Sequence, residues 1–462
     1  MKRLLALLIF VTAVANAQYS VKGTMTPPEE SDWVILYKIE GAKQKFISNS
    51  TIVFEDVNIG GNTQKVGRFE LNLPPDAKEG AYRVTYRNSG AGFVDFFFNK
   101  ENIEFVFNPV YPEESIVFTK SRENKVYREY LDAIATMQRS IDSLQVEYLK
   151  NEDKKFKKAY KKAYKEQGEI QEIYEGKSEG MLVNTFIEAS KPTNSSSIFD
   201  DTQEYLDYVV SNFFKNVDFS NSKLYSSPFI VDKITNYVFY LNIAESQSAQ
   251  QKLYNESIAK VMGLVKDKKV RKEVIEYLIT RFANARNSEI VDGLFTNYYD
   301  KLPSNFQDQK FRDDKVALLR ATVGRTAPDF SWKEGENEYK LSSLNDGEKY
   351  LLVFWSTGCS HCLKEIPQLH SFMKTHNKTS VIAFGIEQAE PEWTAYIKKL
   401  DGWHNAIGTH PDNKWENEVV RTYQLVGTPT YFILNKDKKI IAMPNSFEDV
   451  KDYFVNSSAD KE

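Results

Sequence analysis

The residues best suited to chemistry in this 462-residue chain are its two cysteines, Cys359 and Cys362, in the segment LLVFWSTGCSHCLKEIP. Two cysteines separated by two residues can exchange disulfides, supply half of a zinc site or form a structural bridge. A bridge of this kind closes a very short loop, so it removes little entropy from the unfolded chain and stabilises poorly. A structural zinc ion needs four nitrogen or sulfur ligands at matched spacing, but the chain has no second C-x-x-C, and its five histidines do not complete such a set. We therefore expect redox chemistry at the pair and no metal site.

The elements predicted around the two cysteines favour a reactive thiol. The run YLLVFWS, residues 350–356, is continuously apolar, which is typical of a buried strand, and a helix is expected over residues 360–374. Cys359 would then lie at the start of that helix, where free backbone N–H groups and the helix dipole favour a thiolate, and the thiolate is the nucleophile in disulfide exchange. Cys362 would lie one turn further along the same face. We expect Cys359 to attack a disulfide and Cys362 to resolve the mixed disulfide.

The start of the chain predicts export. A basic start, KR, precedes an apolar run at residues 4–15, and residues 15–17 form the A-x-A pattern of a signal-peptide cleavage site. We expect residues 1–17 to be a signal peptide cleaved after Ala17, and the mature protein to be periplasmic. No later segment offers the ~20 consecutive apolar residues of a membrane-spanning helix, and the net charge of -4 does not favour nucleic acid as a partner.

The remaining chain divides into three predicted domains. Residues 18–118 contain short runs of β-branched and aromatic residues between turn-forming clusters, which predicts an all-β, sandwich-like domain with antiparallel strands. Residues 119–321 carry apolar side chains at spacings of three and four, which predicts an α-helical domain. The basic segment at residues 154–165 is interpreted as the solvated face of an amphipathic helix. Residues 322–462 alternate between strands and helices, which predicts an α/β domain with a mixed sheet covered on both faces.

Three motifs lie in a fixed order within residues 322–462: VGRTAPDFSW, then YLLVFWSTGCSHCLKEIP, then VGTPTYFIL. Together they resemble the lead-in, the C-x-x-C segment and the cis-proline segment of the thioredoxin superfamily, specifically of the exported TlpA/ResA-like thiol–disulfide oxidoreductases. The preceding residues resemble, less sharply, the β-domain and helical region found ahead of thioredoxin domains in some exported proteins. The resemblance implies a thioredoxin-like fold and a thiol–disulfide oxidoreductase whose substrates are protein thiols and disulfides. It also implies an upstream redox partner, and no cofactor other than a redox-active Cys359–Cys362 disulfide.

The resemblance implies a substrate-binding surface around the disulfide. Pro429 matches the proline that is cis in the family. The backbone of Thr428 would then lie beside the disulfide and pair with an extended stretch of substrate. Trp355 and His361 are expected to contribute to the same surface.

Glu365 is the expected proton acceptor. It matches a glutamate of the exported group and follows Cys362 by three residues, so it would share a helix face with that thiol. A carboxylate there could take up the proton that Cys362 loses when it attacks the mixed disulfide. Ordinary thioredoxin has an aspartate in the strand six residues before the first cysteine, where this chain has Val353.

The residues between the cysteines leave the direction of the reaction open. His361 would stabilise the Cys359 thiolate and so make the disulfide a better oxidant, as in relatives with C-G-H-C or C-P-H-C sites. The TlpA/ResA-like group works mostly as reductants. Reduction of substrates is therefore slightly favoured.

Two other functions are compatible with parts of the sequence. A thiol peroxidase shares the fold but needs P-x-x-x-T-x-x-C, and this chain has Leu352 at the proline position and Ser356 at the threonine position. A binding or scaffold protein would use the β and helical domains to hold a partner, with the redox site secondary. For residues 18–320 we expect a role in positioning the redox domain, by homodimer formation or by shaping a substrate cleft.

Overall fold

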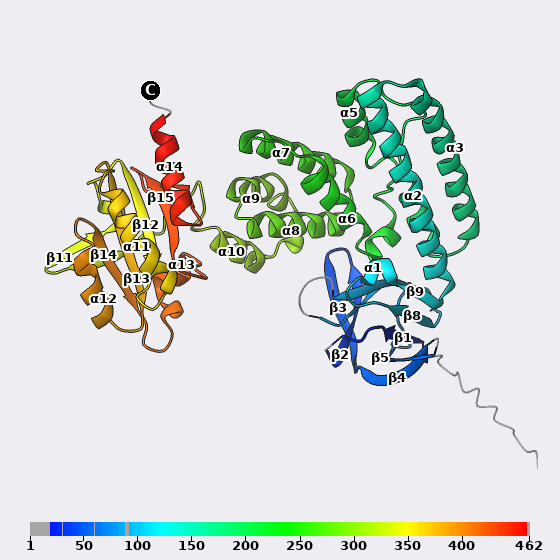
Figure 1. Ribbon diagram of the computed structural model, residues 1–462, viewed down its shortest axis with the longest axis horizontal. Coiled ribbons are helices and arrows are strands. Elements are labelled where there is room, and N and C mark those ends of the chain that lie inside the picture. The colour runs from blue at the N-terminus through cyan, green and yellow to red at the C-terminus, as the bar shows by residue number, and fades with distance from the viewer. Residues whose placement is uncertain (1–18, 30, 60, 88–91, 460–462) are drawn as a thin grey trace, which may run out of the picture. The chain divides into compact units, whose positions relative to one another are not determined.

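The computed structural model describes residues 19–459 apart from residues 30, 60 and 88–91, so the predicted signal peptide, residues 1–17, lies outside the described residues. The chain forms two compact units that divide between Glu273 and Val274. This point lies inside helix α8 (Lys268–Asn284), which is labelled in Figure 1. The division falls within the stretch that the sequence predicts as one helical domain. Within the described part of the chain, no helix is both long and apolar enough to cross a membrane.

The first unit begins with two β-sheets that share one hydrophobic core. The strands are β1 Ser20–Met25, β2 Trp33–Glu40, β3 Lys43–Thr51, β4 Val53–Ile59, β5 Asn62–Asn72, β6 Gly80–Thr85, β7 Phe93–Phe98, β8 Ile103–Phe107 and β9 Val117–Lys120, in the orders β4-β5-β1-β8-β9 and β3-β2-β6-β7. Successive side chains of a strand point to opposite faces, and inward residues of both sheets, such as Val21, Leu36, Phe96 and Phe105, form one cluster. This arrangement fits the predicted sandwich-like domain. The described neighbours are antiparallel except β1 and β8, which run parallel, so the expectation of antiparallel strands was wrong at that pair.

Helices make up the rest of the first unit. They are α1 Pro112–Ser115, α2 Arg122–Asn151, α3 Lys154–Lys177, α4 Asn184–Ala189, α5 Thr202–Asn212, α6 Phe229–Thr235 with the π-helical turn η2 Asn236–Leu241, α7 Gln247–Leu264 and the start of α8. The chain reverses between α2 and α3 at Glu152, whose φ of 52° is left-handed, and Asp153 caps α3 by accepting from the Lys155 N–H. The lysines of the basic segment 154–165 are exposed on α3, which confirms its interpretation as a solvated helix face.

The second unit continues from α8 into a five-stranded mixed sheet. Helices α9 Ser288–Leu294 and α10 Gln309–Leu318 come first, followed by the hairpin of β10 Ser331–Glu334 and β11 Asn337–Lys340. The main sheet has the order β14-β13-β12-β15-β16, with bounds β12 Lys349–Trp355, β13 Thr379–Glu387, β14 His404–Thr409, β15 Thr430–Asn435 and β16 Ile440–Ala442. Strands β12, β13 and β14 are parallel, while β15 and β16 are antiparallel, so the sheet is mixed as predicted.

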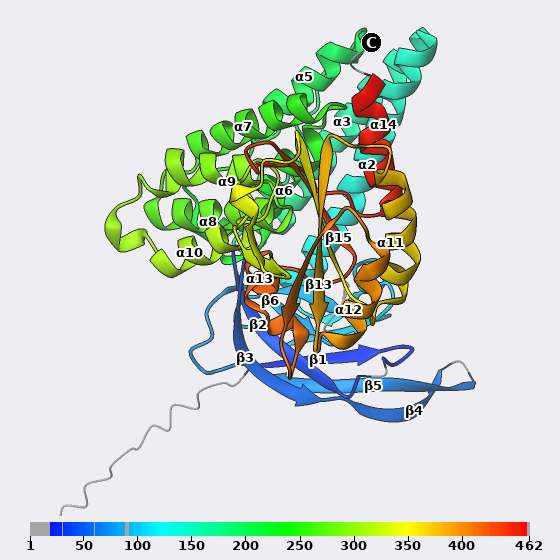
Figure 2. The ribbon, with the colours of Figure 1, turned by 90° about the vertical axis from the view of Figure 1, so that its left-hand side faces the viewer.

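Helices cover both faces of this sheet because the central strand β12 is buried on both sides. The helices are α11 Ser360–Met373, α12 Pro391–Tyr396, α13 Glu418–Thr422 and α14 Phe447–Ala459. Leu351 and Val353 share one core with Ile366 of α11 and Val450 of α14. The alternate residues of β12 face a second core that includes Tyr423, directly after α13. Figure 2 shows α11 and α14 on one side of the sheet and α13 on the other.

Candidate active site

Cys359 is the residue that caps the N-terminus of α11. Its backbone is extended, with φ -107° and ψ 112°, and its sulfur accepts a hydrogen bond from the backbone N–H of Cys362 at 3.2 Å. The first N–H groups of a helix have no partner inside the helix, so a sulfur placed there meets donors that stabilise its anion. Both cysteines are free thiols in this structure.

The two thiols are tuned in opposite directions. Burial alone would raise the pKa of Cys359. Hydrogen bonds from the side chains of Cys362 and Thr428 and from the backbone of Cys362 and His361 outweigh that effect and lower the pKa below its ordinary value. Cys362 is fully buried, and burial together with its hydrogen bond to Cys359 raises its pKa to about 12. Cys359 is therefore the thiol that ionises first, and Cys362 stays protonated beside it.

The segment before β15 lies against the attacking sulfur. The Cys359 thiol donates to the backbone carbonyl of Thr428 at 3.3 Å, and the Thr428–Pro429 peptide bond is cis. Both Thr428 and Pro429 are partly exposed, and Val426 just before them is 95% exposed. The structure thus places an accessible stretch of backbone next to Cys359. Sequence reasoning did not single out Val426, whose apolar side chain in an exposed loop is the signal that could have drawn attention to it.

Glu365 contacts a tyrosine that sequence reasoning missed. The Glu365 carboxylate is half-buried and accepts from the Tyr431 hydroxyl at 2.8 Å and from the Phe447 backbone N–H at 3.3 Å. Burial raises the pKa of Tyr431, as do Glu365 and the charges of Cys362 and Cys359, so the phenol lies within electrostatic range of both thiols. Within the described residues, no hydrogen bond joins Glu365 directly to either cysteine. Tyr431 pairs with Val353 across β12 and β15, and its position two residues after Pro429, on the α11 side of the sheet, is a pattern that could have identified it.

A buried polar network holds the turn between β12 and α11. Glu387, at the end of β13, is 7% exposed and accepts from the Thr357 backbone N–H at 2.6 Å and from the Ser356 hydroxyl at 3.3 Å. The Ser356 oxygen in turn accepts from the Lys414 ammonium at 2.7 Å and from the Gly358 N–H at 3.2 Å. Sequence reasoning also missed Glu387 and Lys414. The only local signal was an acidic residue closing the apolar run SVIAFGI.

Trp355 is buried, whereas His361 is exposed. Trp355 is fully buried and packs on Tyr396, with ring centroids 5.1 Å apart. Its side chain therefore offers no surface to a substrate, and its expected role in substrate binding is wrong. Trp355 instead belongs to the hydrophobic core that also contains Cys362. His361 is exposed beside the cysteine pair.

Comparison with known proteins bears on the second unit. Residues 347–440 match a protein family described as thioredoxin-like. Sporulation thiol-disulfide oxidoreductase A of Bacillus subtilis is 32% identical over 110 residues, which cover 23% of this chain and 63% of that protein. Thiol-disulfide oxidoreductase ResA of Geobacillus thermodenitrificans is 29% identical over 151 residues, which cover 31% of this chain and 80% of that protein. A solved domain of a possible thiol-disulfide isomerase from Cytophaga hutchinsonii is 27% identical and covers 30% of this chain and 94% of that chain, with a TM-score of 0.26.

These similarities show that the chain contains a thioredoxin-like domain near its C-terminus, similar to TlpA/ResA-like proteins. The matches to the two curated relatives cover less than a third of this chain. The matched part of this chain spans 63%, just under two thirds, of the length of the B. subtilis protein.

Proposed function

We propose that this chain is an exported thiol–disulfide oxidoreductase that acts on protein cysteines through Cys359 and Cys362. The thioredoxin-like domain and the names of its relatives support an oxidoreductase. The observation that carries the proposal is the opposite tuning of the two thiols, with a lowered pKa at Cys359 and a raised pKa at the buried Cys362. The periplasmic location rests on the predicted signal peptide.

The proposed reaction balances two electrons and two protons. The Cys359 thiolate attacks one sulfur of a substrate disulfide, and the other substrate sulfur leaves as a thiolate that takes up a proton. Cys362 then loses its proton and attacks the Cys359 sulfur, which releases the second substrate thiolate. The substrate is reduced to a dithiol, and the protein pair is oxidised to a disulfide that an upstream redox partner must reduce. No other cofactor takes part, and the reverse sequence oxidises a substrate dithiol.

Glu365 and Tyr431 are proposed to receive the proton of Cys362. The phenolic oxygen of Tyr431 would accept the thiol proton while its own proton passes to Glu365, to which it is hydrogen-bonded at 2.8 Å. This assigns Glu365 the expected role of base and Tyr431 the role of a relay. The exposed backbone at Thr428 and Pro429 is proposed to pair with an extended stretch of substrate, flanked by His361.

Two measurements test the proposed function. Cys362→Ser should accumulate a mixed disulfide with its substrate on Cys359, detectable by mass spectrometry, while Cys359→Ser should form none. The reduction potential of the pair should then fix the direction, which we propose as reduction: a value near ~-270 mV indicates a reductant and one near ~-120 mV an oxidant. Failure of the two thiols to cycle between reduced and disulfide forms would refute the oxidoreductase.

The thiol peroxidase alternative gains no support from the geometry. The Ser356 hydroxyl, which would replace the threonine of peroxidases, is fully buried and bonded to Glu387, Lys414 and Gly358. Peroxide consumption by the purified protein would test it directly. We also propose that residues 18–320 position the redox domain, by homodimer formation or by shaping a substrate cleft. Comparing the activity of the full-length protein with that of a 322–462 fragment on the same substrates tests this role.

A further inference from the structure

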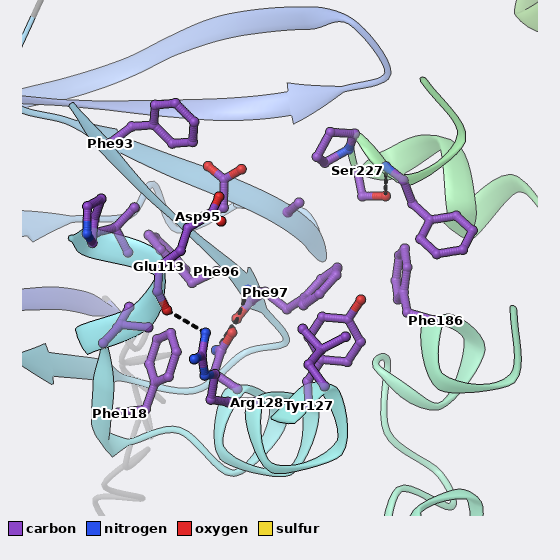
Figure 3. A pocket seen from close by; sticks show the side chains of 18 of the residues that line it. Phe93, Asp95, Phe96, Phe97, Glu113, Phe118, Tyr127, Arg128, Phe186 and Ser227 are labelled. Atoms are coloured by element: carbon purple, nitrogen blue, oxygen red, sulfur yellow. Dashed lines mark hydrogen bonds between the residues drawn. The ribbon is translucent and has the colours of Figure 1, made fainter. Parts of the chain in front are cut away.

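The first unit contains a cavity of about 310 Å³ beside its β-sheets, shown in Figure 3. Residues from β7, α1, α2, α4 and α6 line it, so segments far apart in the sequence meet there. Its volume lies at the lower end of the range that small-molecule sites occupy. The cavity belongs to the unit that does not carry the cysteine pair, so a ligand there would not require the proposed redox function.

One wall of the cavity is aromatic. Phe97 packs on Phe186 with ring centroids 4.4 Å apart and meets Tyr127 edge-on at 5.2 Å. Phe186 also meets Phe229 edge-on at 5.9 Å, so the four rings form a continuous wall. Such rings offer hydrocarbon contact, and their faces attract cations.

The arginines near the cavity are already paired. Arg83 makes two hydrogen bonds to Asp95, at 2.6 and 2.7 Å, and its guanidinium lies 3.6 Å from the centre of the Phe93 ring. Arg128 forms an ion pair with Asp132 at 3.0 Å and donates to the backbone carbonyl of Glu113. The Arg83 group is an internal example of a cation held between an aromatic face and a carboxylate.

Two carboxylates lining the cavity have no such partner. Among the described residues, the side chains of Glu113 and Asp232 form no hydrogen bond or ion pair. Both carboxylates are exposed at the edge of the cavity. Partial desolvation raises the pKa of Asp232 to about 6, and the negative charges of Asp95 and Glu113 act in the same direction against the opposing effect of Arg83. These couplings place the acidic groups within electrostatic range of one another. Because Arg83 and Arg128 are paired with Asp95 and Asp132, the carboxylates of Glu113 and Asp232 are left as charges without an ion-pair partner among the described lining residues.

We propose that this cavity binds a small organic amine in its cationic form, with its hydrocarbon part against the aromatic wall and its ammonium group near Glu113 and Asp232. Charge complementarity selects this ligand class, because an anion would be repelled and a neutral apolar molecule would desolvate the carboxylates without replacing their hydration. A free amine and the side chain of a lysine in a polypeptide share this chemistry, and their relative affinities distinguish the two sources.

Isothermal titration calorimetry of the full-length mature protein at pH 7.5 tests the ligand class. Benzylamine, which is cationic at that pH, should bind, while benzyl alcohol of nearly the same shape should bind at least about tenfold more weakly and benzoate should not bind. Tighter binding of Nα-acetyl-lysine methylamide than of benzylamine would identify a polypeptide lysine as the source, and the opposite order a free amine. Equal binding of benzylamine and benzyl alcohol, or no binding of either amine to the folded protein, would overturn the proposal.

Variants locate the site. Asp232→Asn and Glu113→Gln each remove one negative charge with little change of shape, and each should weaken benzylamine binding at least about tenfold. Glu114→Gln is the matched control, because Glu114 is the neighbouring exposed acid on α1 and does not line the cavity. Unchanged affinity in both cavity variants, with thermal melts showing that they are folded, would overturn the assignment to this cavity.

The pH dependence gives a second readout that needs no substitution. Asp232 is faced by Arg83 and Asp95 from β6 and β7, by Glu113 from α1, and by Tyr127 and Arg128 from α2. Because its pKa is raised to about 6, Asp232 takes up a proton as the pH falls from 7.5 to 5 and its attraction for the ammonium group is lost. Benzylamine affinity should therefore fall over this range in the native protein and change less in Asp232→Asn. An affinity that stays constant over this range in the native protein would count against the site.

Discussion

Replacing Tyr431 with phenylalanine tests how the proton of Cys362 leaves. Burial and the contact with Cys359 raise the pKa of Cys362 to about 12. At pH 7 such a thiol is ionised in about one molecule in 10⁵, whereas an ordinary cysteine with a pKa of ~8.5 is ionised in about one in 30. In the mixed disulfide Cys359 no longer carries a charge, so the part of the shift due to that charge disappears, but the part due to burial stays. The resolving step therefore needs a base that takes the proton during the attack.

We expect Tyr431→Phe to slow the resolving step at pH 7 by about 10- to 100-fold. This is at or below the lower end of the ~10²–10⁴ that general bases contribute, because the Glu365 carboxylate stays in place. The substitution removes only the hydroxyl that donates to Glu365 at 2.8 Å, so the attack by Cys359 should keep its rate. The deficit should shrink as the pH rises, because hydroxide then removes the thiol proton directly.

Stopped-flow absorbance with the aromatic disulfide dithiobis(nitrobenzoate) separates the two steps. Attack by Cys359 releases one coloured thiolate, and resolution by Cys362 releases the second, so Tyr431→Phe should retain the first phase and slow the second. Tyr396→Phe is the matched control, because Tyr396 also lies within electrostatic range of Cys362 but packs on Trp355. A second phase at the native rate across the pH range would refute the relay, and slowing in Glu365→Gln alone would show that Glu365 acts without the phenol.

Three further outcomes are expected. Alkylation of Cys359 by iodoacetamide should show a midpoint below that of a free cysteine, because its pKa is lowered despite partial burial, and a midpoint at or above the ordinary value would contradict the site geometry. Glu387→Gln should lower the free energy of unfolding in urea by about 1–3 kcal/mol, because the nearly buried carboxylate accepts from the Thr357 N–H at 2.6 Å; Glu390→Gln, an exposed acid nearby, should change it little. Asp232→Asn should raise the melting temperature more at pH 7.5 than at pH 4. The folded-state pKa of this acid is raised to about 6, so its ionisation costs folding free energy that grows as the pH rises from the ordinary value of 3.8 to about 6 and is complete above that. An equal effect at both pH values would contradict this.

The features that sequence reasoning predicted are those set by local pattern. The continuous apolar run at residues 350–356 and the helix after Cys359 depend on spacing and on capping within a few residues, and the structure has both. Strand β14 (His404–Thr409) was not predicted, because HNAIGT is short and its strand character comes from pairing with β13. The hairpin of β10 and β11 escaped prediction for the same reason, being two strands of four residues each.

The parts of the site that sequence reasoning missed depend on contacts between distant residues. Glu387 lies 31 residues from Ser356, and Lys414 lies 58 residues from it, so neither contact leaves a local signal. For Trp355 the local pattern was the better guide. Its place at the end of an apolar strand indicated burial, and the structure buries it, whereas the resemblance indicated contact with a substrate.

Strand β1 is the central strand of its five-stranded sheet. This position affects folding during synthesis and limits how far the N-terminus can be truncated. β1 is the first described strand to be synthesised, yet one neighbour, β5, begins at Asn62 and the other, β8, at Ile103. A nascent chain released before residue 103 would leave one side of that strand open, and open strand edges promote aggregation. For the same reason, trimming the N-terminus past Ser20 would remove the middle of the sheet, so a truncated gene product that keeps a folded first unit has to start before that residue.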